Sequence, residues 1–148
     1  MMKKLILPLF LFAAMSATAQ TTIAEVFKQM PDSLLPYLSK NNRLDMIDFM
    51  EAGMKAEVTN LLDGTSTMNT LSSDSLSIKM NDCMTVTLRL VERDSTVVEM
   101  RQTYKISEDQ EQTVVRYYST SWYPLTKKSV LHSSLLRRDD DVFSRRHF

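Results

Sequence analysis

The apolar positions between residues 22 and 31 recur at the spacing of an amphipathic helix. Thr22 and Glu25 have the spacing of a capping box, which predicts that the helix begins there. Pro31 ends it, because proline disfavours a helical conformation in the residue before it. The apolar residues on the inner side of this helix are Ile23, Val26, Phe27 and Met30.

Two further helical segments are predicted before Gly53. A short turn is capped by Asp32 or Ser33 and has Pro36 in its first turn, where the missing N–H is tolerated. A longer helix is capped by Asn41-Asn42, and Gly53 stands where a C-cap glycine belongs. Its polar stripe is narrow, so we expect it to be mostly buried. The stripe consists of Asp45, Asp48 and Glu51, and the apolar residues are Leu44, Met46, Ile47, Phe49 and Met50.

After Gly53 the period changes to 2, which is typical of strands. The cleanest alternation runs from Met84 to Leu90, and Asp63-Gly64 is a turn signal. The predicted strands are 56–62, 68–71, 76–80, 84–90, 96–104 and 113–119, with turns at 81–82 and 93–95, a polar loop at 107–112 and Trp122 on a continuation of the last strand.

Strand follows strand without an intervening helix, which predicts an antiparallel meander. The fold class is therefore α+β, with short N-terminal helices packed on one face of an antiparallel β-meander sheet. The face toward the helices should carry Ile78, Val86, Leu88, Met100 and Tyr118.

The N-terminus has the layout of a secretory signal peptide. Lys3 and Lys4 precede an apolar run over residues 5–14, and Ala17-Thr18-Ala19 fits a signal peptidase site. We expect cleavage after Ala19 and export to the periplasm or cell surface. No later apolar run is long enough to cross a bilayer, so we expect no transmembrane segment in the mature chain.

The charge divides the mature chain into a single domain over residues 20–125 and a basic tail over residues 126–148. The domain carries 10 Lys+Arg and 15 Asp+Glu, a net of −5, which argues against nucleic acid as a partner. The tail carries six basic and three acidic residues, a net of +3. Arg137–Asp141 is typical of solvated chain, which predicts a tail dispensable for the fold. The alternative is that a last strand or helix completes the core through Val130, Leu131, Leu135 and Leu136.

Motifs for common chemistries are missing from the sequence. Gly53 and Gly64 stand alone, so there is no phosphate loop, and a serine triad would need His132 or His147 in the tail. Cys83 and these two histidines are too scattered for a zinc site. Asp139–Asp141 lacks the spaced oxygens of a calcium loop. We therefore expect no metal and no cofactor.

Other candidate residues have a structural interpretation beside a functional one. Cys83 is expected to pack at a strand start, the alternatives being an intermolecular disulfide or a catalytic thiol. The acidic stripe of Asp45, Asp48 and Glu51 on the third helix is expected to be a solvated face. The alternative is that it supplies the two acids of a hydrolase. Met46, Met50 and Met54 recur every four residues and are expected to pack in the core. The alternatives are a partner-binding groove and a Cu(I) site.

Four aromatic residues near the last strand are the most plausible contact surface in the sequence. They either line a ligand surface or cap an open end of the sheet. These candidate ligand-binding residues are Tyr117, Tyr118, Trp122 and Tyr123.

Four segments of the sequence have a specific pattern: Phe27-x-x-Met30-Pro31-Asp32-Ser33-Leu34-Leu35-Pro36-Tyr37-Leu38, Asn42-Arg43-Leu44-Asp45-Met46-Ile47-Asp48-Phe49, Val58-x-Asn60-x-x-x-Gly64 and Tyr118-Ser119-x-x-Trp122-x-Pro124-Leu125. Together they resemble an uncharacterised family of exported proteins from the Bacteroidales. The resemblance covers about residues 27–125 and implies a Gram-negative envelope setting, with no catalytic residues to carry over.

The leading functional hypothesis is an exported non-enzymatic domain that binds a protein or a small apolar ligand of the cell envelope. The rival is a carboxylate-based hydrolase acting on envelope glycans, which needs two acids converging in a cleft. A purely structural envelope component is a third option.

Overall fold

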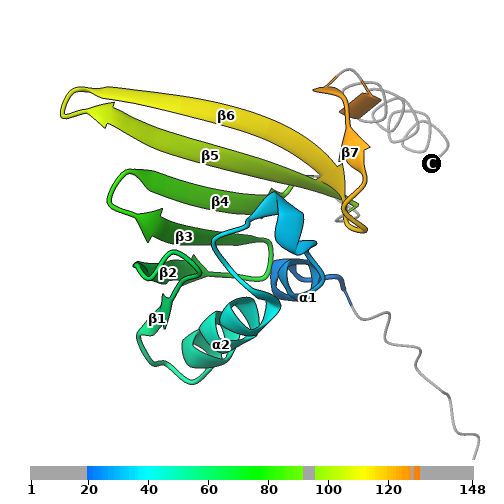
Figure 1. Cartoon of the computed structure of the whole chain (residues 1–148). Helices are drawn as coiled ribbons and strands as arrows, with labels where there is room; N and C mark the ends of the chain where they lie inside the picture. The colour runs from blue at the N-terminus through cyan, green and yellow to red at the C-terminus, as the bar shows by residue number, and fades with distance from the viewer. Residues whose placement is uncertain (1–19, 92–95, 128, 131–148) are drawn as a thin grey trace, which may run out of the picture.

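The structure is a computed structural model that describes residues 20–91, 96–127 and 129–130. Within these ranges, two α-helices and a 3-10 helix come first, and seven strands follow (Figure 1). The elements are α1 (Ile23–Lys28), η1 (Asp32–Leu34), α2 (Lys40–Glu51), β1 (Ala56–Thr59), β2 (Thr65–Leu71), β3 (Ser75–Asn81), β4 (Met84–Leu90), β5 (Val97–Ser107), β6 (Gln110–Ser119) and β7 (Pro124–Leu125).

The strands form one sheet in chain order, β1 to β7, and every neighbouring pair is antiparallel. The predicted α+β meander is confirmed. α2 packs on β1 and β2, and α1 packs on β3 and β4. The long β5–β6 hairpin projects beyond the helices (Figure 1). Among the described residues, no helix is long and apolar enough to span a membrane.

The helix ends follow side-chain caps. The Thr22 hydroxyl accepts a hydrogen bond from the Glu25 N–H at 3.4 Å, so the predicted start of α1 is confirmed. α2 begins earlier than predicted, because Ser39 is its cap: Ser39 Oγ accepts from the Asn42 N–H and Asn42 Oδ1 accepts from the Ser39 N–H, each at 3.1 Å. The cap expected at Asn41-Asn42 is therefore wrong, although Asn42 completes the capping box.

Gly53 follows α2 with φ of +69°, the left-handed conformation expected of a C-cap glycine. The short helical turn differs from its prediction, because η1 ends at Leu34 and Pro36 comes after it. The predicted turn at 93–95 lies outside the described residues.

Several strand boundaries differ from the sequence prediction, and β2 begins at Thr65 rather than residue 68. β1 ends at Thr59 rather than residue 62, because Asn60 begins a side-chain-braced turn. The 107–112 loop is shorter than expected, since the cross-strand pairs of β5 and β6 continue to Ser107 and Gln110. Trp122 does not continue β6, because it has φ of +66° in the turn that leads to β7.

One apolar core fills the space between the helices and the inner face of the sheet. The five residues expected on that face are all buried, as predicted. The core does not extend over α2 as expected: Leu44, Phe49 and Met50 are half-buried, and Met46 and Ile47 point inward. The core residues of at most 2 % exposure are Ile23, Phe27, Met30, Leu35, Leu38, Met46, Ile47, Ala56, Met68, Leu76, Ile78, Met80, Val86, Leu88, Val98 and Met100.

The largest buried side chain of α2 is charged. Arg43 is 1 % exposed, and its Nη1 donates to Asp32 Oδ1 at 2.7 Å and to the Leu38 carbonyl at 3.0 Å. Its Nη2 donates to the Met30 carbonyl at 2.7 Å. The guanidinium therefore ties the segment between α1 and α2 to the first turn of α2.

Replacing Leu88 in the middle of β4 tests this core. Leu88→Ala should lower the free energy of unfolding by about 2–5 kcal/mol, because it leaves a cavity among fully buried neighbours. The exposed α2 residue Asp48 supplies the control, and Asp48→Ala should stay within about 0.5 kcal/mol. Urea denaturation measures both, and equal losses would contradict the assigned core.

Candidate functional site

The four aromatic residues predicted as a contact surface are divided by the fold. Tyr118 and Trp122 are buried, and their ring centroids lie 5.6 Å apart at the end of the core. Trp122 Nε1 donates to the Val26 carbonyl at 2.9 Å, which ties the last turn to α1. Tyr117 is half-buried on the opposite face of β6, and Tyr123 is exposed. The four side chains therefore do not form one surface.

Tyr117 joins a polar cluster on the outer face of the sheet. Glu99 is only 8 % exposed there, because Arg89, Arg101 and Tyr117 surround it. Its carboxylate lies 3.1 Å from Arg101 Nη2 and 3.6 Å from Arg89 Nη2, and the Tyr117 hydroxyl donates to it at 3.4 Å. The Glu99 carboxylate is thus neutralised by ion pairs with two arginines, and the Arg101 side chain remains half-exposed beside it.

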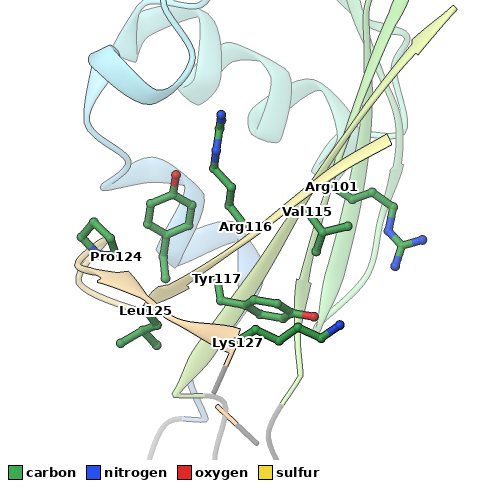
Figure 2. A pocket seen from close by; sticks show the side chains of 8 residues that line it. Arg101, Val115, Arg116, Tyr117, Pro124, Leu125 and Lys127 are labelled. Atoms are coloured by element: carbon green, nitrogen blue, oxygen red, sulfur yellow. The ribbon is translucent and has the colours of Figure 1, made fainter. Parts of the chain in front are cut away.

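A cavity of about 510 Å³ lies beside this cluster, where β7 meets β6 (Figure 2). The pairing of β7 covers only Tyr117 and Tyr118 of the β6 edge. Arg101 and Arg116 point in opposite directions, since Arg101 is paired with Val115 on the outer face and Arg116 with Met100 on the inner face (Figure 2). The lining consists of Arg101, Val115, Arg116, Tyr117, Tyr118, Pro124, Leu125 and Lys127.

A second surface lies at the β1–β2 turn, which the sequence did not single out. Leu61 and Leu62 are 60 % and 67 % exposed, although their turn is firmly held. Leu62, with Pro36 and Tyr37, lines a hollow of about 270 Å³. We call Pro36, Tyr37, Leu61 and Leu62 the leucine-turn surface.

Asn60 holds this turn from inside. Its Oδ1 accepts from the N–H groups of Leu62 at 3.0 Å and Gly64 at 3.1 Å. Its Nδ2 donates to Ser66 Oγ at 3.0 Å, and Ser66 Oγ donates to the Met80 carbonyl at 2.7 Å. A Cβ at position 64 would lie 3.4 Å from Asn60 Nδ2, at about van der Waals distance, so the amide packs closely under the turn.

The remaining N–H groups of the turn are also paired with backbone carbonyls. Asn60 donates to Gly64 at 2.8 Å, Leu61 to Tyr37 at 2.9 Å and Asp63 to Asn60 at 3.1 Å. Every N–H from residue 60 to 64 therefore has an acceptor. The two leucines are held in place by a fixed backbone, and the contact with Tyr37 joins the turn to the η1–α2 segment.

The acidic residues of the described chain lie mostly at the surface. Asp45, Asp48 and Glu51 are all exposed on α2, as expected of a solvated face. Asp82 and Glu111 line one hollow of about 160 Å³. The hydrogen bond and charge of Lys79, 2.9 Å away, lower the pKa of Asp82, whereas a general acid needs a raised one.

The sulfur-containing candidates are also explained by position. Cys83 is exposed in the turn before β4, so the expectation of a packed thiol is wrong. Its N–H donates to Asn81 Oδ1 at 2.8 Å, which turns this residue outward. Met46 is in the core, Met50 is half-buried and Met54 is exposed. Within the part of the chain that the structure describes, no three His, Cys, Asp or Glu side chains gather as metal ligands would.

These features define an α+β domain built on one open antiparallel sheet. The chain belongs to the family described as "Protein of unknown function (DUF3256)", which matches residues 14–145. The resemblance noted over residues 27–125 is confirmed, and the match extends beyond it at both ends. No curated protein matches the chain.

The chain is similar to a solved structure, with a TM-score of 0.58 and 24 % identity over 72 % of this chain. It is described as "Structure of a domain of an uncharacterized protein from Porphyromonas gingivalis W83". The match spans 54 % of that solved chain, and this likeness supports the fold alone.

The brace under the leucine-turn surface can be tested by removing its amide. Asn60→Ala leaves the N–H groups of Leu62 and Gly64 without their acceptor, so both amides should exchange much faster with deuterium. Global stability should fall by about 1–3 kcal/mol, because Ser66 also loses a buried partner. Asn69→Ala on an exposed position of β2 is the control. Unchanged exchange at both amides would show that the side chain does not hold the turn.

Proposed function

We propose that this chain is an exported, non-enzymatic binding domain of the cell envelope, placed in the periplasm or at the cell surface. Its ligand is a protein partner that inserts an apolar side chain at the leucine-turn surface. The observation that carries the proposal is the exposure of Leu61 and Leu62 on a turn whose five N–H groups are all paired.

Exposed leucines on a fixed backbone favour binding for a thermodynamic reason. Association normally loses free energy when loops and side chains become ordered at the interface. The leucine turn is ordered before a partner arrives, so more of the free energy of apolar burial remains as affinity. Removing one leucine side chain from water contributes about 1.5–3 kcal/mol.

The size of the hollow favours a protein over a small apolar molecule. Small-molecule sites usually measure about 300–1,000 Å³ and enclose most of the ligand. A hollow of about 270 Å³ lined by Pro36, Tyr37 and Leu62 suits a single inserted side chain. The hydrolase alternative has less support, because the hollow lined by Asp82 and Glu111 measures about 160 Å³, which is below the usual size of small-molecule sites of about 300–1,000 Å³.

Export has its own test. The basic start, the apolar run and Ala17-Thr18-Ala19 predict cleavage after Ala19. The intact mass of the protein recovered from the periplasm or cell surface should correspond to a chain beginning at Gln20. A mass that retains residues 1–19 would contradict export by this route.

Site-specific photocrosslinking in the producing cell tests the docking surface. A benzophenone side chain at position 62 should give discrete crosslinked protein products. The same group at position 106, an exposed apolar site on the distant β5–β6 hairpin, should not. Adding Asn60→Ala should weaken the products from position 62, because the turn is no longer held in place.

Two results would count against the proposal. Identical products from positions 62 and 106 would indicate non-specific contact. Undiminished products with Leu61→Ser would show that the apolar surface is not what the partner recognises. Because Leu61 is exposed, that substitution should alter folding stability by no more than about 0.5 kcal/mol.

A further inference from the structure

One side of β6, the last long strand of the sheet, is open over much of its length (Figure 1). β7 pairs there with Tyr117 and Tyr118, and no other described residue pairs with β6 on that side. The stretch before Tyr117 is exposed to solvent, and Val115 is 40 % exposed. We call residues 111–115 the β6 edge.

The backbone hydrogen bonds of β6 show which of its residues face this edge. The Ser119 N–H donates to the Tyr123 carbonyl, on the β7 side, at 2.9 Å. Backbone groups alternate sides along an antiparallel strand, and β5 and β6 keep one register from Ser119 to Glu111. The N–H and C=O groups of Glu111, Thr113 and Val115 therefore point to the β6 edge, where no described residue pairs with them.

The two edges of the sheet differ in how they are protected. Exposed edges usually carry a lysine, a proline, a bulge or a covering element, or are very short. β1 is short and α2 packs on it, with Asn42 Nδ2 donating to the Thr59 carbonyl at 3.2 Å. The β6 edge contains neither lysine nor proline, and the register shift of the hairpin, at Lys105 and Ser107, lies beyond it. The β6 edge is therefore competent to pair with another strand.

A second copy of the chain matches this edge in one two-fold register. An axis perpendicular to the sheet places Thr113 opposite Thr113 of the second copy and Glu111 opposite its Val115. All the backbone groups that face the β6 edge then have partners. An axis at Gln112 would leave Val115 facing the hairpin turn, and an axis at Val114 would bring Glu111 against β7.

Charge favours the same register. Glu111 is the one charged residue of the β6 edge, and it would lie beside Val115 of the second copy, which lines the β6–β7 cavity. The described lining of that cavity includes Arg101, Arg116 and Lys127 and no acidic side chain. Opposite charges across paired strands stabilise the pairing and fix its register. Each copy would thus bring a carboxylate to the cations of the other.

We propose that this chain forms a two-fold dimer in which the β6 edges of two copies pair antiparallel, centred on Thr113. The two sheets then become one continuous sheet. The leucine turn lies at the other end of the sheet order, so the dimer presents two leucine-turn surfaces at its far ends. A partner with two binding sites would gain apparent affinity from this arrangement. The dimer itself does not rest on the function proposed for the leucine turn.

Position 113 provides the test, because it is the edge residue that faces itself. Thr113→Lys and Thr113→Glu each place like charges opposite one another, so each variant alone should dimerise at least about tenfold more weakly than the unchanged chain. A one-to-one mixture of the two variants should restore the dimer, which would also exclude misfolding as the cause. Thr70→Lys and Thr70→Glu, at an exposed position of β2, are the matched controls. Sedimentation velocity at several protein concentrations measures the association.

A disulfide provides a second readout of the same contact. All variants carry Cys83→Ser, because the native thiol is exposed and would interfere. Residues of a hydrogen-bonded antiparallel pair have Cα atoms about 5.5 Å apart, which a disulfide can span. Thr113→Cys should therefore form a covalent dimer under mild oxidation much faster than Thr70→Cys.

Three outcomes would overturn the proposal. The unchanged chain sedimenting as a monomer at high micromolar concentration would show that the edges do not pair. A dimer unaffected by either charge at position 113 would place the interface elsewhere, and a mixture that stays monomeric would exclude the two-fold axis at Thr113. Photocrosslinking from position 62 reports on the other end of the sheet, so the two proposals fail separately.

Discussion

The buried guanidinium of Arg43 is the constraint on which the helical layer depends. A charge that is 1 % exposed is tolerated only when hydrogen-bond acceptors replace water. Asp32 and the carbonyls of Met30 and Leu38 supply them, while Nε has no acceptor among the described residues. The irregular segment between the helices must therefore fold around one side chain of α2. Losing an acceptor would leave part of the charge unsatisfied, at about 1–3 kcal/mol.

The segments that resemble the family contain internal locks of this kind. The first is the hydrogen bond from Arg43 to Asp32, and the second is the hydrogen bond from the Gly64 N–H to Asn60. The third is the hydrogen bond from Trp122 to the Val26 carbonyl, which joins residues 96 positions apart in the sequence. A buried donor or acceptor fixes a geometry that apolar packing alone leaves free. These three contacts fix how the helices, the β1–β2 turn and the last turn are placed relative to one another.

The sequence predicted the meander because each strand of β3, β4 and β5 has one apolar face, and alternation reveals that directly. It could not predict the cap of α2, since Ser39 and Asn42 act as a pair whose geometry is reciprocal. Nor could it predict the leucine-turn surface. The sequence placed Leu61 and Leu62 at the end of a predicted strand, whereas in the structure they lie in the exposed turn that Asn60 braces. The aromatic cluster failed as one surface because alternate residues of β6 face opposite sides.

The helices pack on the inner face of β1 to β4 and cover the apolar core there. The outer face of the sheet has no helical cover among the described residues. On the outer face, charge provides part of the cover: Arg89 and Arg101 enclose Glu99, which keeps polar groups over the middle strands. At Val115 and Leu125 that polar cover ends and apolar atoms remain. Helices cover the inner face of β1 to β4, and ion pairs cover the middle of the outer face. An apolar area beside β7 is covered by neither. The chain itself passes this area at Lys127.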